Sequence, residues 1–296
     1  TEKVYIVSDA DKLLLGAPAI LELGLLQECQ DVQVSIRAVK LTPESRLRSK
    51  DDVKKAYPEL FKGIGKLGEP FTIHMKDGVE PFCLNLPRRV PIPLRQKLKE
   101  EIEKLEELDI IEKVTGPTDW CAPIVVVAKP DGKVRLCVDL TKLNNGVKRE
   151  LYPMPTVEST LGQLSKGTVF TKLDANSGFY QIELAPESRK LTTFITPFGR
   201  YQFRRLPFGI SSAPEAFQKR ISEILQGIPN VICHMDDILV VGTQTTHDET
   251  LKAVLDRLKC SGMTLNEKKC IFAATELEYL GQVIGQDDIS KDPKKV

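Results

Sequence analysis

The clearest hydrophobic pattern in the chain runs from residue 94 to residue 108. Leu94, Leu98, Ile102, Leu105 and Leu108 follow one another at steps of four, four, three and three residues, with Glu and Lys between them. This spacing places the apolar side chains on one face of an α-helix and the charged ones on the other. The pattern predicts an amphipathic helix.

Three β-hairpins are predicted further along the chain. They cover residues 124–140, 193–203 and 230–242, and each joins two runs of strand-forming residues through a short turn. The first turns at Pro-Asp-Gly and the second at Pro-Phe-Gly. The third turns at or beside a pair of adjacent aspartates.

A further strand is predicted over residues 168–174, TVFTKLD. Side chains alternate along a strand, so Phe170, Lys172 and Asp174 share one face. The strand is apolar except near its end, where Asp174 is followed by small residues.

Two segments have the residue spacing of helix capping boxes. Ser212-Ala-Pro-Glu215 and Thr246-His-Asp-Glu249 predict helices that end near Leu225 and Gly262. The resulting order of strands, hairpins and helices predicts an α+β fold, an antiparallel sheet with helices on one face. Residues 41–80 are charged, contain Gly and Pro and show little periodicity, so they are predicted to be a linker.

The composition excludes several classes of protein. The chain has 296 residues and a net charge of +1, so a nucleic-acid surface has to come from local clustering of basic residues. No apolar run is long enough for a membrane span and no signal peptide opens the chain, so neither membrane insertion nor secretion is expected. Seven scattered cysteines without a Cys-x-x-Cys motif argue against a zinc site and a disulfide framework. The start at Thr1 is expected for a piece of a longer protein.

Asp236 and Asp237 lie side by side between apolar strand residues. At about 4 Å and an effective dielectric constant of about 20, two like charges cost on the order of 4 kcal/mol. A solvated polar turn is one way to tolerate the pair, and a bound cation is the other. Carboxylate oxygens suit Mg²⁺ or Mn²⁺, while only three histidines are available for zinc or copper. Asp174 is the best candidate for a third ligand, and two ions bridged by such acids drive phosphoryl transfer in polymerases.

Several motifs in order then resemble one family. FTKLDANSGFYQIEL, TFITPFGRYQFRRLPFGISSAPEAFQ, HMDDILV and EYLGQVI resemble the reverse transcriptases of gypsy-class LTR retrotransposons, from about residue 81 to the end. The resemblance implies a right-hand polymerase fold, with fingers over residues 81–155 and a palm over residues 156–296 that includes a remaining fingers segment and the primer grip. The thumb is expected to be missing. The implied activity is RNA-directed DNA polymerase, and the parent polyprotein is expected to carry protease, ribonuclease H and integrase.

The same resemblance assigns the metal site. Asp174, Asp236 and Asp237 are implied to be the catalytic acids, and they hold two Mg²⁺ ions together with the main-chain carbonyl of Ala175. One ion would activate the primer 3′-hydroxyl, and the other would carry the triphosphate.

Contacts with the incoming nucleotide are implied for five residues. Arg135 is expected to clamp the triphosphate, for which a planar guanidinium is suited, and Lys129, or in second place Lys133, beside the turn is expected to assist. Phe179 is expected to lie under the sugar and to reject a 2′-hydroxyl by steric contact. Phe208 stands where retroviral relatives usually carry Gln, so only packing is expected of it. Met235 is expected to line the nucleotide site.

Contacts with primer and template are implied for a second set. His234 replaces the Tyr that is common in the Asp-Asp motif, and its ring is expected beside the primer terminus. Arg204 and Arg205 belong to a basic run without acids, which is expected to follow the template–primer backbone. Leu280 and Gly281 resemble the strand that grips the primer, where glycine permits close approach.

Residues 13–26, LLLGAPAILELGLL, resemble the C-terminal helix region of a retropepsin-like protease. Residues 1–40 are therefore expected to be the remnant of such a protease, without its active-site turn. The expected partners are an RNA or DNA template with its primer and deoxynucleoside triphosphates, in a cytoplasmic particle or the nucleus. The alternatives are a retroelement relic that binds nucleic acid without catalysis and a metal-free, ferredoxin-like RNA-binding module.

Overall fold

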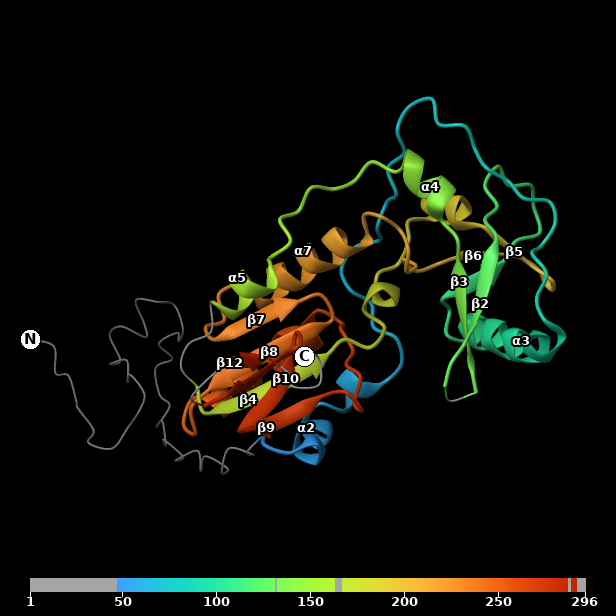
Figure 1. Cartoon of the computed structure of the whole chain (residues 1–296). Helices are drawn as coiled ribbons and strands as arrows, with labels where there is room; N and C mark the ends of the chain where they lie inside the picture. Colours follow the sequence, from blue (N-terminus) through green and yellow to red (C-terminus); the bar gives the residue numbers. More distant parts are fainter. Residues whose placement is uncertain (1–46, 131, 163–166, 287–288, 292–296) are drawn as a thin grey trace, which may run out of the picture. The chain divides into compact units, whose positions relative to one another are not determined.

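An antiparallel sheet of four strands, in the order β7-β8-β4-β9, is the central element of the C-terminal half of the chain (Figure 1). Its strands are β4 (Val169–Asp174), β7 (Val231–His234), β8 (Asp237–Gly242) and β9 (Ile271–Ala274). The structure is a computed structural model that describes residues 47–130, 132–162, 167–286 and 289–291. The predicted protease remnant, residues 1–40, lies outside the described residues.

Each face of this sheet is covered by a different apolar cluster. The covering elements are α5 (Val157–Leu161), α7 (Ala213–Leu225), α8 (His247–Cys260), β10 (Glu276–Tyr279) and β11 (Gln282–Gly285). Leu173 and Val240 pack on one face with α7 and α8, whereas Phe170 and Leu239 pack on the other with α5 and the β10–β11 hairpin. The predicted antiparallel sheet is therefore confirmed, and the two long helices α7 and α8 lie on one of its faces. A hairpin and a short helix cover the opposite face.

The remaining elements between residues 92 and 203 include two smaller sheets, β2-β3 and β1-β6-β5. The helices and strands in this range are α3 (Ile92–Glu107), β1 (Ile111–Lys113), β2 (Ile124–Ala128), β3 (Val134–Val138), α4 (Thr141–Gly146), η2 (Gly178–Gln181), α6 (Pro186–Arg189), η3 (Lys190–Thr192), β5 (Phe194–Thr196) and β6 (Gly199–Phe203). Strand β12 (Ile289–Lys291) extends the β10–β11 hairpin. Helix α3 buries Leu98, Ile102 and Leu105, as its periodicity predicts. None of the helices in the described ranges combines the length and the apolar character needed to cross a bilayer.

The prediction of a linker over residues 41–80 is wrong for the part that the structure describes. Residues 47–80 contain α2 (Lys50–Ala56) and η1 (Pro58–Phe61), and they contribute Val53, Leu60 and Leu67 to the main core. The Tyr57 hydroxyl donates to Asp256 Oδ1 of α8 at 2.7 Å. The apolar residues of this segment are spaced too irregularly to produce a periodic signal, because most of the segment lies outside long helices and strands.

The two predicted capping boxes are absent, although both helices are present. Ser212 and Thr246 have helical rather than extended backbone angles, with ψ of −2° and −21°, so their hydroxyls do not cap the helix. Glu215 forms an ion pair with Arg149 instead. A capping box does occur at the start of α2, where Ser49 Oγ accepts from the Asp52 N–H at 3.1 Å.

Candidate active site

The predicted pair of acids lies at the tight turn between β7 and β8. His234 and Asp237 are partners in the antiparallel register, so Met235 and Asp236 alone form the turn. Met235 has a φ of 54°, a left-handed conformation that a bulky residue adopts only when its surroundings hold it there. Its N–H donates to Gln218 Oε1 at 2.7 Å, which attaches the turn to helix α7. The Nδ1 atom of His234 is buried without a hydrogen-bond partner.

Asp174 reaches the same place from the neighbouring strand. It is the last residue of β4 and pairs with Asp237 across the antiparallel ladder. The next residue, Ala175, donates its N–H to the Asp236 carbonyl at 2.8 Å. Side chains of directly paired residues are neighbours on one face of a sheet. The strand register therefore brings together the acids that the sequence analysis singled out.

Burial makes the negative charge of two of these acids unfavourable. Only 6% of Asp174 is exposed, and burial raises the pKa of its carboxyl above the ordinary value. Burial, followed by the nearby charge of Asp174, raises the pKa of Asp236 to about 6. In both residues Oδ1 is buried and has no hydrogen-bond partner. Buried, partnerless carboxylate oxygens are suitable ligands for a hard divalent cation such as Mg²⁺ or Mn²⁺.

Two lysines form ion pairs with the acids, one from strand β4 and one from the segment before β9. Lys172 Nζ lies 3.0 Å from Asp237 Oδ1, and Lys269 Nζ lies 3.1 Å from Asp174 Oδ2. Within the part of the chain that the structure describes, no three His, Cys, Asp or Glu side chains are arranged to hold a metal ion as they stand. The oxygen donors fit a divalent ion in kind.

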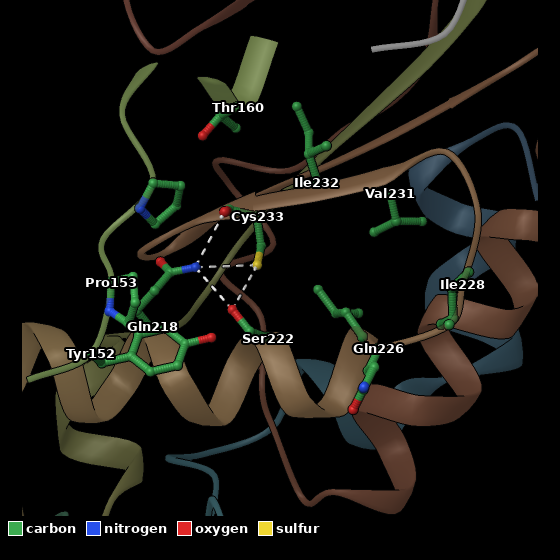
Figure 2. A pocket seen from close by; sticks show the side chains of 13 residues that line it. Tyr152, Pro153, Thr160, Gln218, Ser222, Gln226, Ile228, Val231, Ile232 and Cys233 are labelled. Carbon is green, nitrogen blue, oxygen red and sulfur yellow. Dashed lines mark hydrogen bonds between the residues drawn. The ribbon is translucent and has the colours of Figure 1, made fainter. Parts of the chain in front are cut away.

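Gln218 of helix α7 holds the Met235–Asp236 turn in place through hydrogen bonds. The residue is 1% exposed, and its Nε2 donates to the Cys233 carbonyl at 3.3 Å and to Ser222 Oγ at 3.2 Å. Figure 2 shows these bonds beside a cavity of about 370 Å³ that Gln218 helps to line. Both ends of the amide are engaged, since its oxygen accepts from Met235. The orientation of Gln218 is therefore fixed, and with it the position of the turn.

A second tight turn, between β10 and β11, is attached to the acid pair. Leu280 and Gly281 form it, with φ of 51° and 78°, the conformation of a two-residue hairpin turn with two left-handed residues. Tyr279, the residue before this turn, is fully buried and donates its hydroxyl to the Asp237 carbonyl at 3.2 Å. The hairpin that is predicted to grip the primer is thus connected directly to one of the predicted catalytic acids.

The aromatic residues predicted near the nucleotide form one cluster. Phe179 of η2 is buried, and its ring centroid lies 4.9 Å from that of Phe208 and 5.7 Å from that of Phe217. Phe208 also packs against Tyr180, with centroids 5.1 Å apart, while 47% of Phe208 remains exposed. The contacts of Phe208 in this structure are packing contacts with other rings.

The basic residues predicted near the nucleotide lie on the β2–β3 hairpin. Arg135 pairs with Val127 in the register and is exposed. Burial raises the pKa of Tyr180 to about 12, and the charge of Arg135 counters part of this rise. Lys129 stands at the end of β2, where its N–H donates to the Lys133 carbonyl at 2.8 Å. These placements leave their nucleotide contacts as predictions.

The surroundings of Arg205 do not favour the predicted contact with template or primer, which stays a prediction. Arg205 is 8% exposed, and its guanidinium donates to the main-chain carbonyls of Gly65, Tyr180 and Asp109 at 2.7, 2.9 and 3.3 Å. An arginine with these partners joins three segments of the fold.

Arg204 is accessible, but its charge is paired with acids. Its Nη1 lies 3.1 Å from Asp109 Oδ1 and 3.5 Å from Glu112 Oε2. Strand β1 pairs with β6, so acids from before residue 113 lie beside a basic run that has no acids of its own. Charge counted along the sequence therefore overstated the free positive charge of this region.

Four residues around the acids were missed by sequence reasoning: Gln218, Lys172, Lys269 and Tyr279. Lys172 did carry a signal, because strand alternation placed it on the face of Asp174. The other three approach from helix α7, the segment before β9 and strand β10, and no local pattern reveals those contacts.

The chain is similar to proteins of known family. Residues 127–284 match the family described as reverse transcriptase (RNA-dependent DNA polymerase). The retrovirus-related Pol polyprotein from transposon opus of Drosophila melanogaster is 36% identical over 214 residues, or 70% of this chain and 21% of that polyprotein. An uncharacterized protein of Caenorhabditis elegans is 31% identical over 289 residues, or 96% of this chain and 22% of that protein. The chain thus spans about a fifth of the length of these curated relatives.

A solved structure shares the fold. The foamy viral protease-reverse transcriptase in complex with RNA/DNA hybrid has a TM-score of 0.75 at 19% identity, over 94% of this chain and 39% of that chain. This likeness confirms the predicted α+β polymerase fold. The family match covers more than half of the chain and includes Asp174, Asp236 and Asp237. The chain therefore belongs to the reverse transcriptase family, as the resemblance of its motifs predicted.

Proposed function

We propose that this chain is the catalytic part of an RNA-directed DNA polymerase in a retroelement Pol polyprotein. It extends a primer with deoxynucleoside triphosphates on an RNA or DNA template. The proposal rests on the pairing of Asp174 with Asp237 across β4 and β8, next to Asp236 at the turn. Such a group of acids at the ends of buried strands is suited to two-metal phosphoryl transfer.

The acids and the Ala175 carbonyl would hold two Mg²⁺ ions, and Mn²⁺ would also fit. When bound, such ions activate the primer 3′-hydroxyl and stabilise the leaving pyrophosphate. The protein supplies the positions of the acids. Gln218 holds the Met235 turn, and the Tyr279 hydroxyl holds the Asp237 main chain.

The nucleotide is proposed to lie between the acids and the β2–β3 hairpin. Arg135 is exposed, and its guanidinium can contact phosphate oxygens in a bidentate manner, with Lys129 nearby. Phe179 follows the acid strand and is supported by Phe208 and Phe217. A ring held in this way is a rigid surface that would exclude a 2′-hydroxyl, and Met235 would line the same space.

Template and primer are the proposed macromolecular partners. The related foamy viral enzyme was solved with an RNA/DNA hybrid, which supports a nucleic-acid partner for this chain. The primer contact is proposed at Leu280 and Gly281, because a glycine turn admits a close backbone, with His234 beside the primer end. The proposed location is a cytoplasmic particle or the nucleus.

The alternative of a ferredoxin-like RNA-binding module is disfavoured by the sheet. Such modules stack bases on aromatic side chains of an exposed sheet face. Here both faces of the central sheet are covered. The aromatic residues Phe170 and Tyr279 are buried in the apolar cluster under α5 and the β10–β11 hairpin. An RNA strand has no access to these rings.

Primer extension tests the proposal. The whole chain is incubated with a labelled primer on RNA and DNA templates, deoxynucleotides and Mg²⁺, and it is compared with Asp236→Asn and Asp237→Asn. Asp119→Asn, at an exposed acid outside the site, is the matched control. Incorporation by the wild type and the control, with at least a hundredfold loss in the site variants, is expected. Equal incorporation by all proteins contradicts the proposal. Nucleic-acid binding without incorporation favours the non-catalytic relic.

A further inference from the structure

The two lysines that contact the catalytic acids differ in their surroundings. The Lys269 side chain is 64% exposed, so its ammonium group can leave Asp174 for water. The Lys172 side chain is 20% exposed, and its ammonium group lies between Asp237 and the ring of Tyr279. Only Lys172 is confined to the site.

The strand register fixes the position of Lys172. It pairs with Leu239 of β8, two residues beyond Asp237, and shares a sheet face with the buried Phe170. Its Nζ is 3.0 Å from Asp237 Oδ1 and 5.9 Å from the centroid of the Tyr279 ring. An ammonium group within about 6 Å of an aromatic face is attracted by the ring. Lys172 therefore has two favourable positions for its charge, the carboxylate and the ring.

We propose that Lys172 is an exchangeable counter-cation of Asp237. In the metal-free protein it neutralises the carboxylate, and a divalent ion has to displace it. After displacement the ammonium group stays over the Tyr279 ring. This inference rests on the proposed metal site and adds a property to it.

The consequence is a weaker affinity of the site for divalent ions. Binding exchanges one Lys–carboxylate contact for a metal–carboxylate contact, and the displaced ammonium group remains close to the added positive charge. Like charges at such short range repel, and partial burial leaves little water to screen them. Removal of the lysine charge should therefore strengthen metal binding. A lysine that only organised the acids would show the reverse, because its loss would leave the carboxylates disordered.

Direct metal binding separates these outcomes without an activity assay. Free Mn²⁺ is measured by electron paramagnetic resonance during titration of the whole chain, and isothermal calorimetry with Mg²⁺ repeats the measurement. Lys172→Met removes the charge at similar side-chain length, and Lys172→Arg keeps it. Lys269→Met is the matched control for loss of an exposed lysine beside the same acids.

We expect Lys172→Met to bind its tightest Mn²⁺ ion about five to ten times more strongly than the wild type. Lys172→Arg should stay within about twofold of the wild type, and Lys269→Met should change the affinity by less than about threefold. Unchanged or weaker binding by Lys172→Met overturns the inference. If Lys172→Met does not fold by circular dichroism, Lys172→Gln takes its place with the same expectation.

Asp237→Asn separates this inference from the proposed function. If it abolishes Mn²⁺ binding while Lys172→Met binds like the wild type, the metal site stands and the counter-cation role is wrong. If Asp237→Asn binds Mn²⁺ like the wild type, Asp237 holds no ion, and both the proposed metal site with Asp237 as a ligand and the counter-cation role fail.

Discussion

Gly178 and Asp236 lie so close together that the glycine has no room for a side chain. A Cβ atom on Gly178 would collide with Asp236 Oδ1 and would lie 2.7 Å from the Phe217 ring. Gly178 does not have a positive φ, so its backbone conformation does not require glycine. Glycine is required here for lack of space, because the Asp236 carboxylate and the fully buried Phe217 ring occupy the position of a Cβ atom.

Gly178→Ala should therefore disturb the site more than the fold. Overpacking costs about 1–3 kcal/mol, and Asp236 is the neighbour that can move, because Phe217 is enclosed by the core. Primer extension should fall at least about tenfold, the rate equivalent of about 1.4 kcal/mol. Gly116→Ala is the control, since a Cβ there meets nothing within 4 Å. Full activity of Gly178→Ala would contradict the steric argument.

Asp236→Asn should stabilise the metal-free protein above pH 6. Burial raises the pKa of Asp236 to about 6 from its ordinary value of 3.8, so the ionised carboxylate destabilises the fold. This cost is absent below the unfolded pKa, grows as the pH rises towards 6 and stays constant above it. With allowance for partial exposure, the substitution should add about 1–2 kcal/mol to the free energy of unfolding at pH 7.5 and nothing at pH 4. Urea unfolding with a chelator present measures both values, and an equal gain at both pH values would contradict the prediction.

Tyr279→Phe should slow catalysis without removing the ring. The substitution deletes the hydrogen bond to the Asp237 carbonyl, which is worth about 0.5–1.5 kcal/mol. We expect kcat for primer extension to fall about three- to tenfold, with KM for the nucleotide within about twofold. Tyr201→Phe, at a buried tyrosine of β6, is the control. A change confined to KM would show that the hydroxyl acts elsewhere.

Leu60→Ala tests whether residues 47–80 belong to the folded core. Leu60 is 1% exposed, and a cavity at such a position costs about 2–4 kcal/mol. Leu151→Ala removes the same atoms from a side chain that is 98% exposed and should cost less than about 0.5 kcal/mol. Urea unfolding compares the two variants. Similar values would restore the linker interpretation.

Arg205→Met should destabilise the fold without a change in electrostatic nucleic-acid binding. Three main-chain carbonyls lose their donor, so a loss of about 2–4 kcal/mol is expected. The slope of log affinity for a primer–template against log salt concentration should equal that of the wild type. A slope smaller in magnitude by about one would mean that Arg205 contacts a phosphate after all.

The strands that carry the candidate acids were predictable because they depend on local patterns. Alternation defined β4 and the two strands of the β7–β8 hairpin, and antiparallel pairing of these strands brings Asp174 next to Asp237. The amphipathic pattern likewise located α3 within two residues of its observed start. The strands and the helix are decided by neighbouring residues. The pairing of β4 with β8 joins Asp174 to Asp237 across 63 positions of the sequence, and it was implied by the family resemblance.

The features that sequence reasoning missed depend on distant partners. Arg205 looks like a surface cation until Gly65 and Asp109 are folded around it. Ser212 precedes a helix with the residues of a capping box, yet its backbone takes a helical conformation and Glu215 pairs with Arg149. Tertiary packing decides these two cases, and the sequence around each residue carries no local signal of it.

The covered faces of the central sheet determine how a reactant can arrive. Apolar layers lie against both sides of β4 and β8, while Asp174 is the final residue of one strand and Asp237 the first of the other. In the proposed function, a primer terminus would therefore reach the acids at the ends of these strands. Substitutions within either apolar layer are expected to change how rigidly the acids are held. Substitutions at the ends of β4 and β8 are expected to change the reaction itself.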